Sequence, residues 1–183
     1  MGFVLLILGV ALWWAAHLFK RVLPAQRAAM GDGGKGAVAL ALVAAILLMI
    51  FGYRMTEFIY VWAPPSFMTH INNLLVLIAI YMMSPAPKKG RLLHKLRHPM
   101  LGGFKLWAFA HLLVNGDLAS IILFGGLLAW AVVEVIVLNR AEPEWTRPKP
   151  APRDKEIKAV IITLVIYGVI AGIHTWLGYP VFG

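Results

Sequence analysis

The chain has 183 residues, of which 61% are apolar and only 14% are charged, and its mean hydropathy is +0.79. Soluble domains are about half apolar and a quarter charged, so this composition excludes an ordinary soluble domain and places the chain in lipid. The absence of cysteine excludes disulfides, thiolate metal sites and cysteine nucleophiles. The net charge of +9 at pH 7 is informative mainly through its distribution among the loops.

Six apolar segments have lengths that suit membrane-spanning helices, because a hydrocarbon core about 30 Å thick needs about 17–25 mostly apolar residues. They cover residues 2–19, 37–53, 67–83, 99–114, 118–138 and 157–177. The fourth is the shortest and contains Lys105. It is supported by Pro99, which suits a first helical turn, and by Asn115-Gly116-Asp117, a turn whose Asp can cap the fifth helix. None of the segments shows the period-two alternation of a strand.

The basic residues are concentrated in alternate connections between these segments. Fifteen of the 17 basic residues lie in the first, third and fifth connections or at their edges, namely Lys20, Arg21, Arg27, Lys35, Lys88, Lys89, Arg91, Lys95, Arg97, Arg140, Arg147, Lys149, Arg153, Lys155 and Lys158. The positive-inside rule makes these three connections cytoplasmic and places both termini on the opposite side. A patch that binds nucleic acid would not alternate in this way, so no nucleic-acid partner is predicted.

The predicted fold is an all-α, polytopic bundle of about six transmembrane helices, with both termini on the non-cytoplasmic side and a single domain over residues 1–183. The first segment is not expected to be a cleaved signal peptide, because its basic residues follow the apolar run. Residues 139–156 contain four prolines and many charges, so we expect them to form an extended, exposed connector.

Several polar side chains fall within or beside the apolar segments, where burial in lipid costs free energy. They are His17, His70, Lys105, His111, Asp117, Glu134 and His174. At the helical rise, Lys105 lies about 12 Å above Arg97 and Glu134 about 6 Å above Leu138, and a lysine side chain can extend over the difference. We therefore predict a buried ion pair between Lys105 and Glu134, either to hold the helices together or to handle substrate or protons.

The histidines separate by depth in the predicted bundle. His17 and His98 lie at or near the cytoplasmic boundary, whereas His111 is about 21 Å above Arg97 and His174 about 24 Å above Lys158. Neutral imidazole is a strong ligand for iron, and two histidines at equal depth on separate helices suit b-type haem. Depth pairs His111 with His174. The alternative is that each histidine only bonds a carbonyl across a helix interface.

Two sequence blocks resemble a known family. They read RHPMLG at residues 97–102 and LWAFAHLLVNGD at residues 106–117. This pattern is similar to the signature of NnrU proteins, multipass bacterial membrane proteins associated with nitrite and nitric oxide reduction. The resemblance extends to His17, which basic residues follow, and to His174, which precedes Gly178 and Pro180.

The resemblance implies haem ligands as well as a fold. In the branch that contains the plant zeta-carotene isomerase, haem b is held by a His of the first span and by the His of the AH pair, which match His17 and His111. That branch has a Cys three residues before the second His, where this chain has Ala108. The resemblance thus pairs His111 with His17, while depth pairs it with His174, and both pairings remain open.

A second resemblance concerns the run from Arg97 to Leu106. It is similar to the cytosolic-edge motif of membrane methyltransferases of the isoprenylcysteine carboxyl and phospholipid types, in which the His contacts S-adenosylmethionine. That likeness implies a cofactor contact at His98. The chain departs from those enzymes in its apolar tail and in Glu142 and Glu144, which Pro143 separates.

The sequence therefore favours an NnrU-like protein of the bacterial inner membrane that binds haem b and assists nitrite and nitric oxide reduction. The expected partners are the lipid bilayer and either nitrogen-oxide reductase components or a polyene substrate. Three alternatives remain open: a haem-dependent cis-trans isomerase of a polyene, a methyltransferase that uses S-adenosylmethionine, and a non-catalytic structural partner of a respiratory complex. Because Ala108 replaces the Cys of the isomerase branch, the accessory role is preferred.

Overall fold

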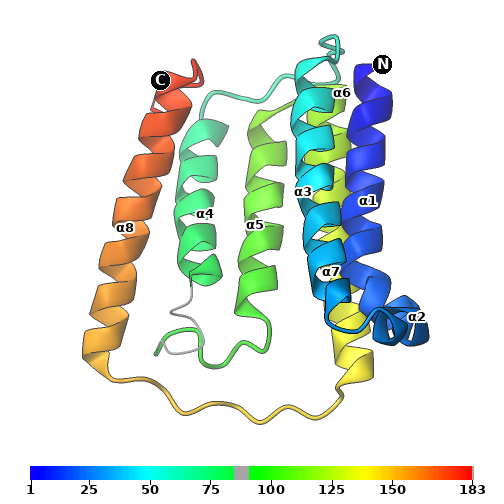
Figure 1. Ribbon diagram of the computed structural model, residues 1–183. Helices are drawn as coiled ribbons and strands as arrows, with labels where there is room; N and C mark the ends of the chain where they lie inside the picture. The colour runs from blue at the N-terminus through cyan, green and yellow to red at the C-terminus, as the bar shows by residue number, and fades with distance from the viewer. Residues whose placement is uncertain (85–90, 183) are drawn as a thin grey trace. The chain divides into compact units, whose positions relative to one another are not determined.

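A computed structural model describes residues 1–84 and 91–182, and these residues form helices joined by loops (Figure 1). Lys88 and Lys89, which belong to the third basic connection, lie outside the described residues. The chain divides into two compact units. Unit 1 comprises residues 1–63 and 115–141, and unit 2 comprises residues 64–114 and 142–183. The single domain predicted over residues 1–183 remains a prediction.

Unit 1 contains α1 (Gly2–Val22), α2 (Pro24–Ala29), α3 (Gly33–Arg54), α6 (Leu118–Ser120), the π-helical turn η1 (Ile121–Gly125) and α7 (Gly126–Ala141). Helices α1 and α3 pack closely because glycines lie where their backbones meet. A Cβ atom on Gly52 would lie 2.4 Å from the backbone nitrogen of Leu6, a residue that is fully buried, as is Ala45. Small residues of this kind allow van der Waals packing between helices in lipid.

The segments α6, η1 and α7 form one continuous helix over residues 118–141, and it packs against α1. Its start is capped as the sequence predicts, because the Asp117 carboxylate accepts a hydrogen bond from the Ser120 backbone N–H at 2.9 Å. The π-helical turn shifts the backbone hydrogen-bonding register. In this region the Gly126 carbonyl accepts a 3.0 Å hydrogen bond from the indole of Trp14.

Unit 2 contains α4 (Met68–Met83), α5 (Pro99–Val114) and α8 (Arg153–Trp176). Helix α4 lies between the other two, in contact with both. Gly103 allows α5 to approach α4, since a Cβ atom there would lie 2.7 Å from the carbonyl oxygen of Ala79. Near the C-terminus, the amide of Asn73 donates a 2.9 Å hydrogen bond to the carbonyl of Val181.

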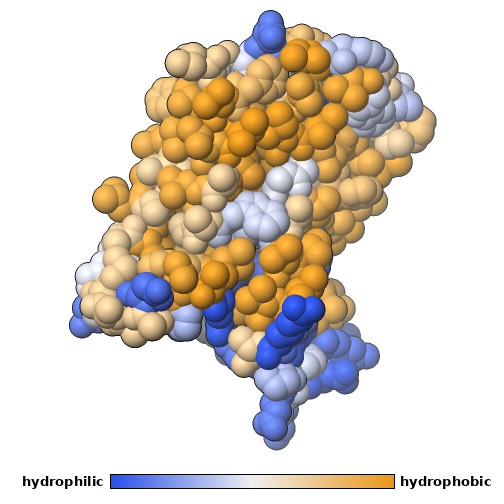
Figure 2. Space-filling model, turned by 90° about the vertical axis from the view of Figure 1, so that its right-hand side faces the viewer, coloured by the Kyte–Doolittle hydropathy of each residue, from blue (hydrophilic) through white to orange (hydrophobic). Residues whose placement is uncertain are grey.

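Large apolar side chains remain exposed on the long helices, as expected of helices that face lipid. Leu40 on α3 is 71% exposed and Val165 on α8 is 60% exposed. Figure 2 shows the apolar surface on one side of the molecule. Among the described residues, four helical segments are long and apolar enough to cross a membrane: Gly2–Val22, Gly33–Arg54, Leu118–Ala141 and Arg153–Trp176.

The prediction of an all-helical membrane chain is confirmed for the described residues. The predicted segment 99–114 has the same bounds as α5, and the other five overlap α1, α3, α4, α6–α7 and α8 with ends displaced by a few residues. Helices α4 and α5 have 16 residues each, so the six spans remain a prediction. The predicted connector is the exposed segment 142–152, shorter than expected because α7 and α8 extend into it.

Candidate functional site

Three half-buried histidines on the long helices share one local geometry. Each Nδ1–H donates a hydrogen bond to the backbone carbonyl four residues earlier, at 3.0 Å in His17 and at 2.9 Å in His111 and His174. Because a carbonyl can only accept, the neutral ring carries its proton on Nδ1 and keeps a lone pair on Nε2. A backbone hydrogen bond of this kind fixes the tautomer of a histidine whose other nitrogen binds a metal.

In unit 1, His17 packs against two indole rings. Its ring centroid is 4.2 Å from that of Trp13 on the same helix and 4.4 Å from that of Trp130 on α7. The two indoles meet edge to face with centroids 5.3 Å apart. The orientation of the His17 ring is therefore fixed both by its backbone hydrogen bond and by aromatic packing between two helices.

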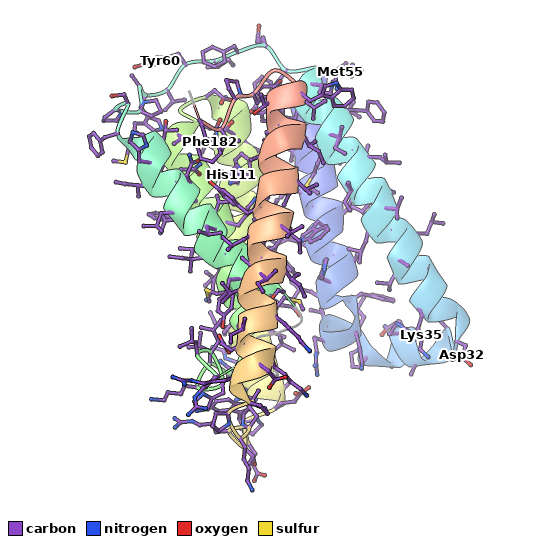
Figure 3. The ribbon with its side chains drawn as sticks, turned by 90° about the vertical axis from the view of Figure 1, so that its left-hand side faces the viewer. Asp32, Lys35, Met55, Tyr60, His111 and Phe182 are labelled. Carbon is purple, nitrogen blue, oxygen red and sulfur yellow. The ribbon has the colours of Figure 1, made fainter. Side chains whose placement is uncertain are left out.

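In unit 2, His111 lies on α5 with its ring centroid 4.9 Å from that of Trp107 (Figure 3). The carbonyl that accepts its Nδ1–H belongs to the same tryptophan. His174 lies on α8 of the same unit. The pairing of His111 with His174, which the depth argument gives, lies within one unit and remains a prediction.

The family of the chain follows from comparison with known proteins. The family described as NnrU protein matches residues 5–181, which is nearly the whole chain. The chain belongs to the NnrU family. A comparison with curated proteins and one with solved structures gave no significant match.

The second resemblance in the sequence singles out His98 of this NnrU chain. His98 immediately precedes α5 and is half-buried, and its carbonyl accepts a 2.9 Å hydrogen bond from the Gly102 N–H. The neighbouring Arg97 donates hydrogen bonds to the carbonyls of Glu142 and Pro143. Arg97 therefore holds the start of the exposed connector, a structural role that the sequence did not indicate.

The predicted Lys105–Glu134 ion pair joins residues of different units and remains a prediction. Lys105 is half-buried on α5 in unit 2. Glu134 is half-buried on α7 in unit 1, where the positive charge of Arg21 reaches it. Its Oε2 atom has no hydrogen-bond partner among the described residues. The pairing of His111 with His17 also joins the two units, so it too remains a prediction.

Sequence reasoning missed the tryptophans that pack on the histidines. Trp13 and Trp107 each precede a histidine by four residues, a spacing that places both side chains on one face of a helix. This W-x-x-x-H pattern occurs once in each unit, on α1 and on α5. Trp130 comes from a distant segment, so no local pattern indicates its contact with His17.

Proposed function

We propose that this NnrU protein crosses the bacterial inner membrane six times, binds b-type haem through His111 and a second histidine, and assists nitrite and nitric oxide reduction. The observation that carries the proposal is the geometry shared by His17, His111 and His174. Each has Nδ1–H bonded to a backbone carbonyl and Nε2 left with a lone pair. Family membership and the resemblance of the RHP and AHL blocks support the role in nitrogen-oxide metabolism.

The residues present fit haem in their donor chemistry. Haem brings four nitrogen ligands of its own, so one or two imidazoles complete its coordination. His111 and His174 are two such donors in one unit, on α5 and α8. When bound, haem supplies one-electron transfer and an iron atom to which nitrogen oxides coordinate.

The protein's own residues would orient the ligands and exclude water. The Trp107 carbonyl holds the Nδ1 proton of His111, which directs Nε2 away from its own helix. Both imidazoles are half-buried on apolar helices, whose side chains would limit the access of water to them. His17 is the other candidate for the second ligand, and the contacts of its ring with Trp13 and Trp130 would hold it in place.

The test is the absorption spectrum of the protein purified in detergent, oxidised and then reduced. We expect the reduced wild-type protein to show sharp absorption bands, and we expect His111→Ala to lose them. Of His174→Ala and His17→Ala, the variant that removes the second ligand should lose the bands or shift their wavelengths. His70→Ala is the matched control, because His70 is an exposed histidine at the start of α4. A folded, colourless wild-type protein would overturn the haem assignment and favour a structural role.

The role in nitrogen-oxide reduction requires a separate measurement. Membranes that contain the protein should consume nitric oxide or nitrite faster than membranes that lack it but hold the same amount of reductase. His111→Ala should abolish the difference if the histidine acts through haem. Equal consumption of nitric oxide or nitrite by membranes with the wild-type protein, with His111→Ala and without the protein would contradict the accessory role. The spectral result would still stand.

A further inference from the structure

Unit 1 carries an apolar groove along α1, separate from the helical histidines. Its volume is about 760 Å³. The lining residues are Ile7, Val10, Ala11, Trp14, Ala15, Leu18, Phe19, Val22, Leu23, Ile122 and Gly126. The polar atom of Trp14, its indole nitrogen, is bonded to the Gly126 carbonyl. The surface of the groove is therefore apolar, and it suits a hydrocarbon ligand.

The shape of the groove follows from the residues on this face of α1. Ala11 and Ala15 are small, so the larger side chains before and after them leave a hollow over the middle of the helix. The lining extends from Ile7 to Leu23, about 24 Å at the helical rise. The groove is open, since Ile7 is 51% exposed and Val22 is 63% exposed.

One end of the groove is strongly basic. We call Lys20, Arg21, Arg27 and Lys35 the basic end. Leu23 lines the groove directly after α1 ends, and its carbonyl accepts a 3.0 Å hydrogen bond from the Arg27 N–H, so α2 begins where this end of the groove lies.

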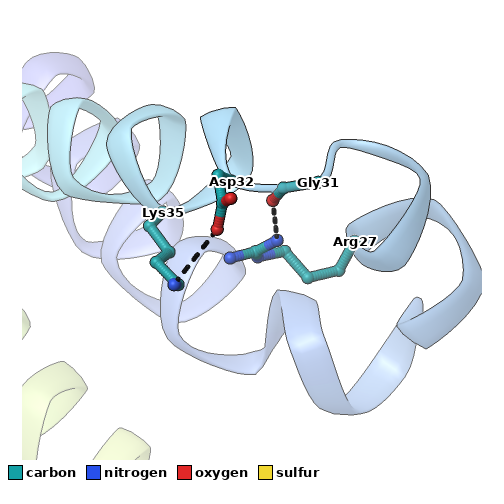
Figure 4. A network of polar contacts seen from close by, with 4 residues as sticks. All are labelled: Arg27, Gly31, Asp32 and Lys35. Carbon is teal, nitrogen blue, oxygen red and sulfur yellow. Dashed lines mark hydrogen bonds and ion pairs between the residues drawn. The ribbon is translucent and has the colours of Figure 1, made fainter.

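Two acidic residues, Asp32 and Glu134, interact with members of this cluster of four basic residues, so they offset only part of its charge. Asp32 pairs with Lys35 at 3.3 Å, and both side chains are strongly exposed (Figure 4), so the pair is weak. The Arg27 guanidinium donates to the Gly31 carbonyl at 3.1 Å, which positions its charge beside the turn that leads into α3. The basic end thus keeps a net positive charge directly beyond an apolar groove.

We propose that this groove binds the acyl chain of an anionic glycerophospholipid, with the phosphate of the headgroup held by the basic end. An anionic phospholipid combines a long hydrocarbon chain with a negative charge at one end, which matches the groove and the basic end. The positive-inside rule places these basic residues at the cytoplasmic leaflet, where anionic headgroups attract basic residues. The site is independent of the haem proposal, because no histidine lines the groove.

The test is a titration of the full-length, detergent-purified protein with phosphatidylglycerol or phosphatidylcholine of identical acyl chains, followed by native mass spectrometry. We expect one phosphatidylglycerol to be retained and phosphatidylcholine to bind more weakly. Lys20→Gln with Arg27→Gln should weaken phosphatidylglycerol binding by roughly tenfold to thirtyfold, since each basic residue near an anionic surface contributes about a factor of five. Arg27→Lys, which keeps the charge, should retain most of the affinity.

The groove itself is tested by Ala11→Phe, which fills the hollow and should abolish retention of the lipid. Leu40→Phe is the matched control, because Leu40 is 71% exposed on α3 and does not line the groove. Equal affinity for the two lipids, or unchanged binding in Ala11→Phe or in the double charge variant, would overturn the proposal. Competition by soluble glycerol phosphate would also overturn it, since the basic end would then bind phosphate without the chain.

Discussion

Gly116 lies so close to Trp62 that a Cβ atom at position 116 would be 1.8 Å from the carbonyl oxygen of Trp62. The Gly116 carbonyl accepts hydrogen bonds from the N–H groups of Val61 at 2.8 Å and Trp62 at 3.0 Å. A further bond joins the Leu118 N–H to the Ile59 carbonyl at 2.9 Å. The turn before α6 is therefore fixed to the segment after α3, in which Tyr60 lies (Figure 3).

Replacing Gly116 with alanine should destabilise unit 1 by about 3 kcal/mol or more, because the added methyl group meets backbone that cannot move without breaking these hydrogen bonds. The measurement is the free energy of unfolding in a titration with denaturing detergent. Gly36→Ala is the matched control, since a Cβ atom at Gly36 meets nothing within 4 Å and alanine favours a helix interior. Equal stability of the two variants would contradict the close contact.

The cap of α6 leads to a second prediction. The Asp117 carboxylate accepts from the Ser120 N–H at 2.9 Å and from the Ser120 hydroxyl at 2.6 Å, and that hydroxyl is 2.8 Å from the Tyr53 hydroxyl. Asp117→Ala should cost about 1–2 kcal/mol of unfolding free energy. Asp117→Asn should cost less, because its amide oxygen can still accept from the backbone N–H. If both variants are equally unstable, the cap is not the source of the loss.

The hydrogen bond from Trp14 to Gly126 leads to a third prediction. Trp14→Phe keeps the aromatic ring but removes the donor, so the Gly126 carbonyl loses its 3.0 Å partner. We expect a loss of about 1 kcal/mol, which is typical of hydrogen bonds between membrane helices. The matched control is Trp176→Phe, because Trp176 is 83% exposed. Equal unfolding free energies for wild type and Trp14→Phe would show that the π-helical turn does not need this donor.

Much of the fold can be predicted from the sequence because lipid imposes length and apolarity on each helix. The bounds of α5, Pro99–Val114, follow from a proline that starts the helix and from the Asn-Gly-Asp turn that follows it. The six-residue helix α2 is too short to show a periodic pattern. The π-helical turn contacts α1, and Trp14 of that helix bonds to the Gly126 carbonyl. The local composition does not indicate this partner, because it comes from another part of the chain.

The candidate site can be predicted only in part. The depth of a residue along its helix can be calculated from the sequence, but the rotation of that helix about its own axis cannot. The rise per residue places His111 and His174 at similar depth, and both lie in unit 2. The direction of each ring depends instead on hydrogen bonds and neighbouring rings. For His17, one such neighbour is Trp130, which comes from another helix.

The proposed orientation is testable because the chain contains no cysteine, so each introduced cysteine is the sole target of a maleimide. Tyr60→Cys and Phe182→Cys replace residues that are 64% and 71% exposed, and the positive-inside rule puts both outside the cytoplasm. Both should react with a membrane-impermeant maleimide in intact spheroplasts. Lys149→Cys, in the exposed basic connector, should react only after the membrane is permeabilised.

A cysteine inserted directly after Met1 completes the topology test. Six crossings place both ends of the chain on one side of the membrane, so this variant should be labelled in intact spheroplasts just as Phe182→Cys is. Labelling of one end without the other would mean an odd number of crossings, and either α4 or α5, the two 16-residue helices, would then be the first candidate for a helix that does not span. Labelling of Lys149→Cys before permeabilisation would reverse the orientation and place the basic end of the α1 groove at the outer leaflet.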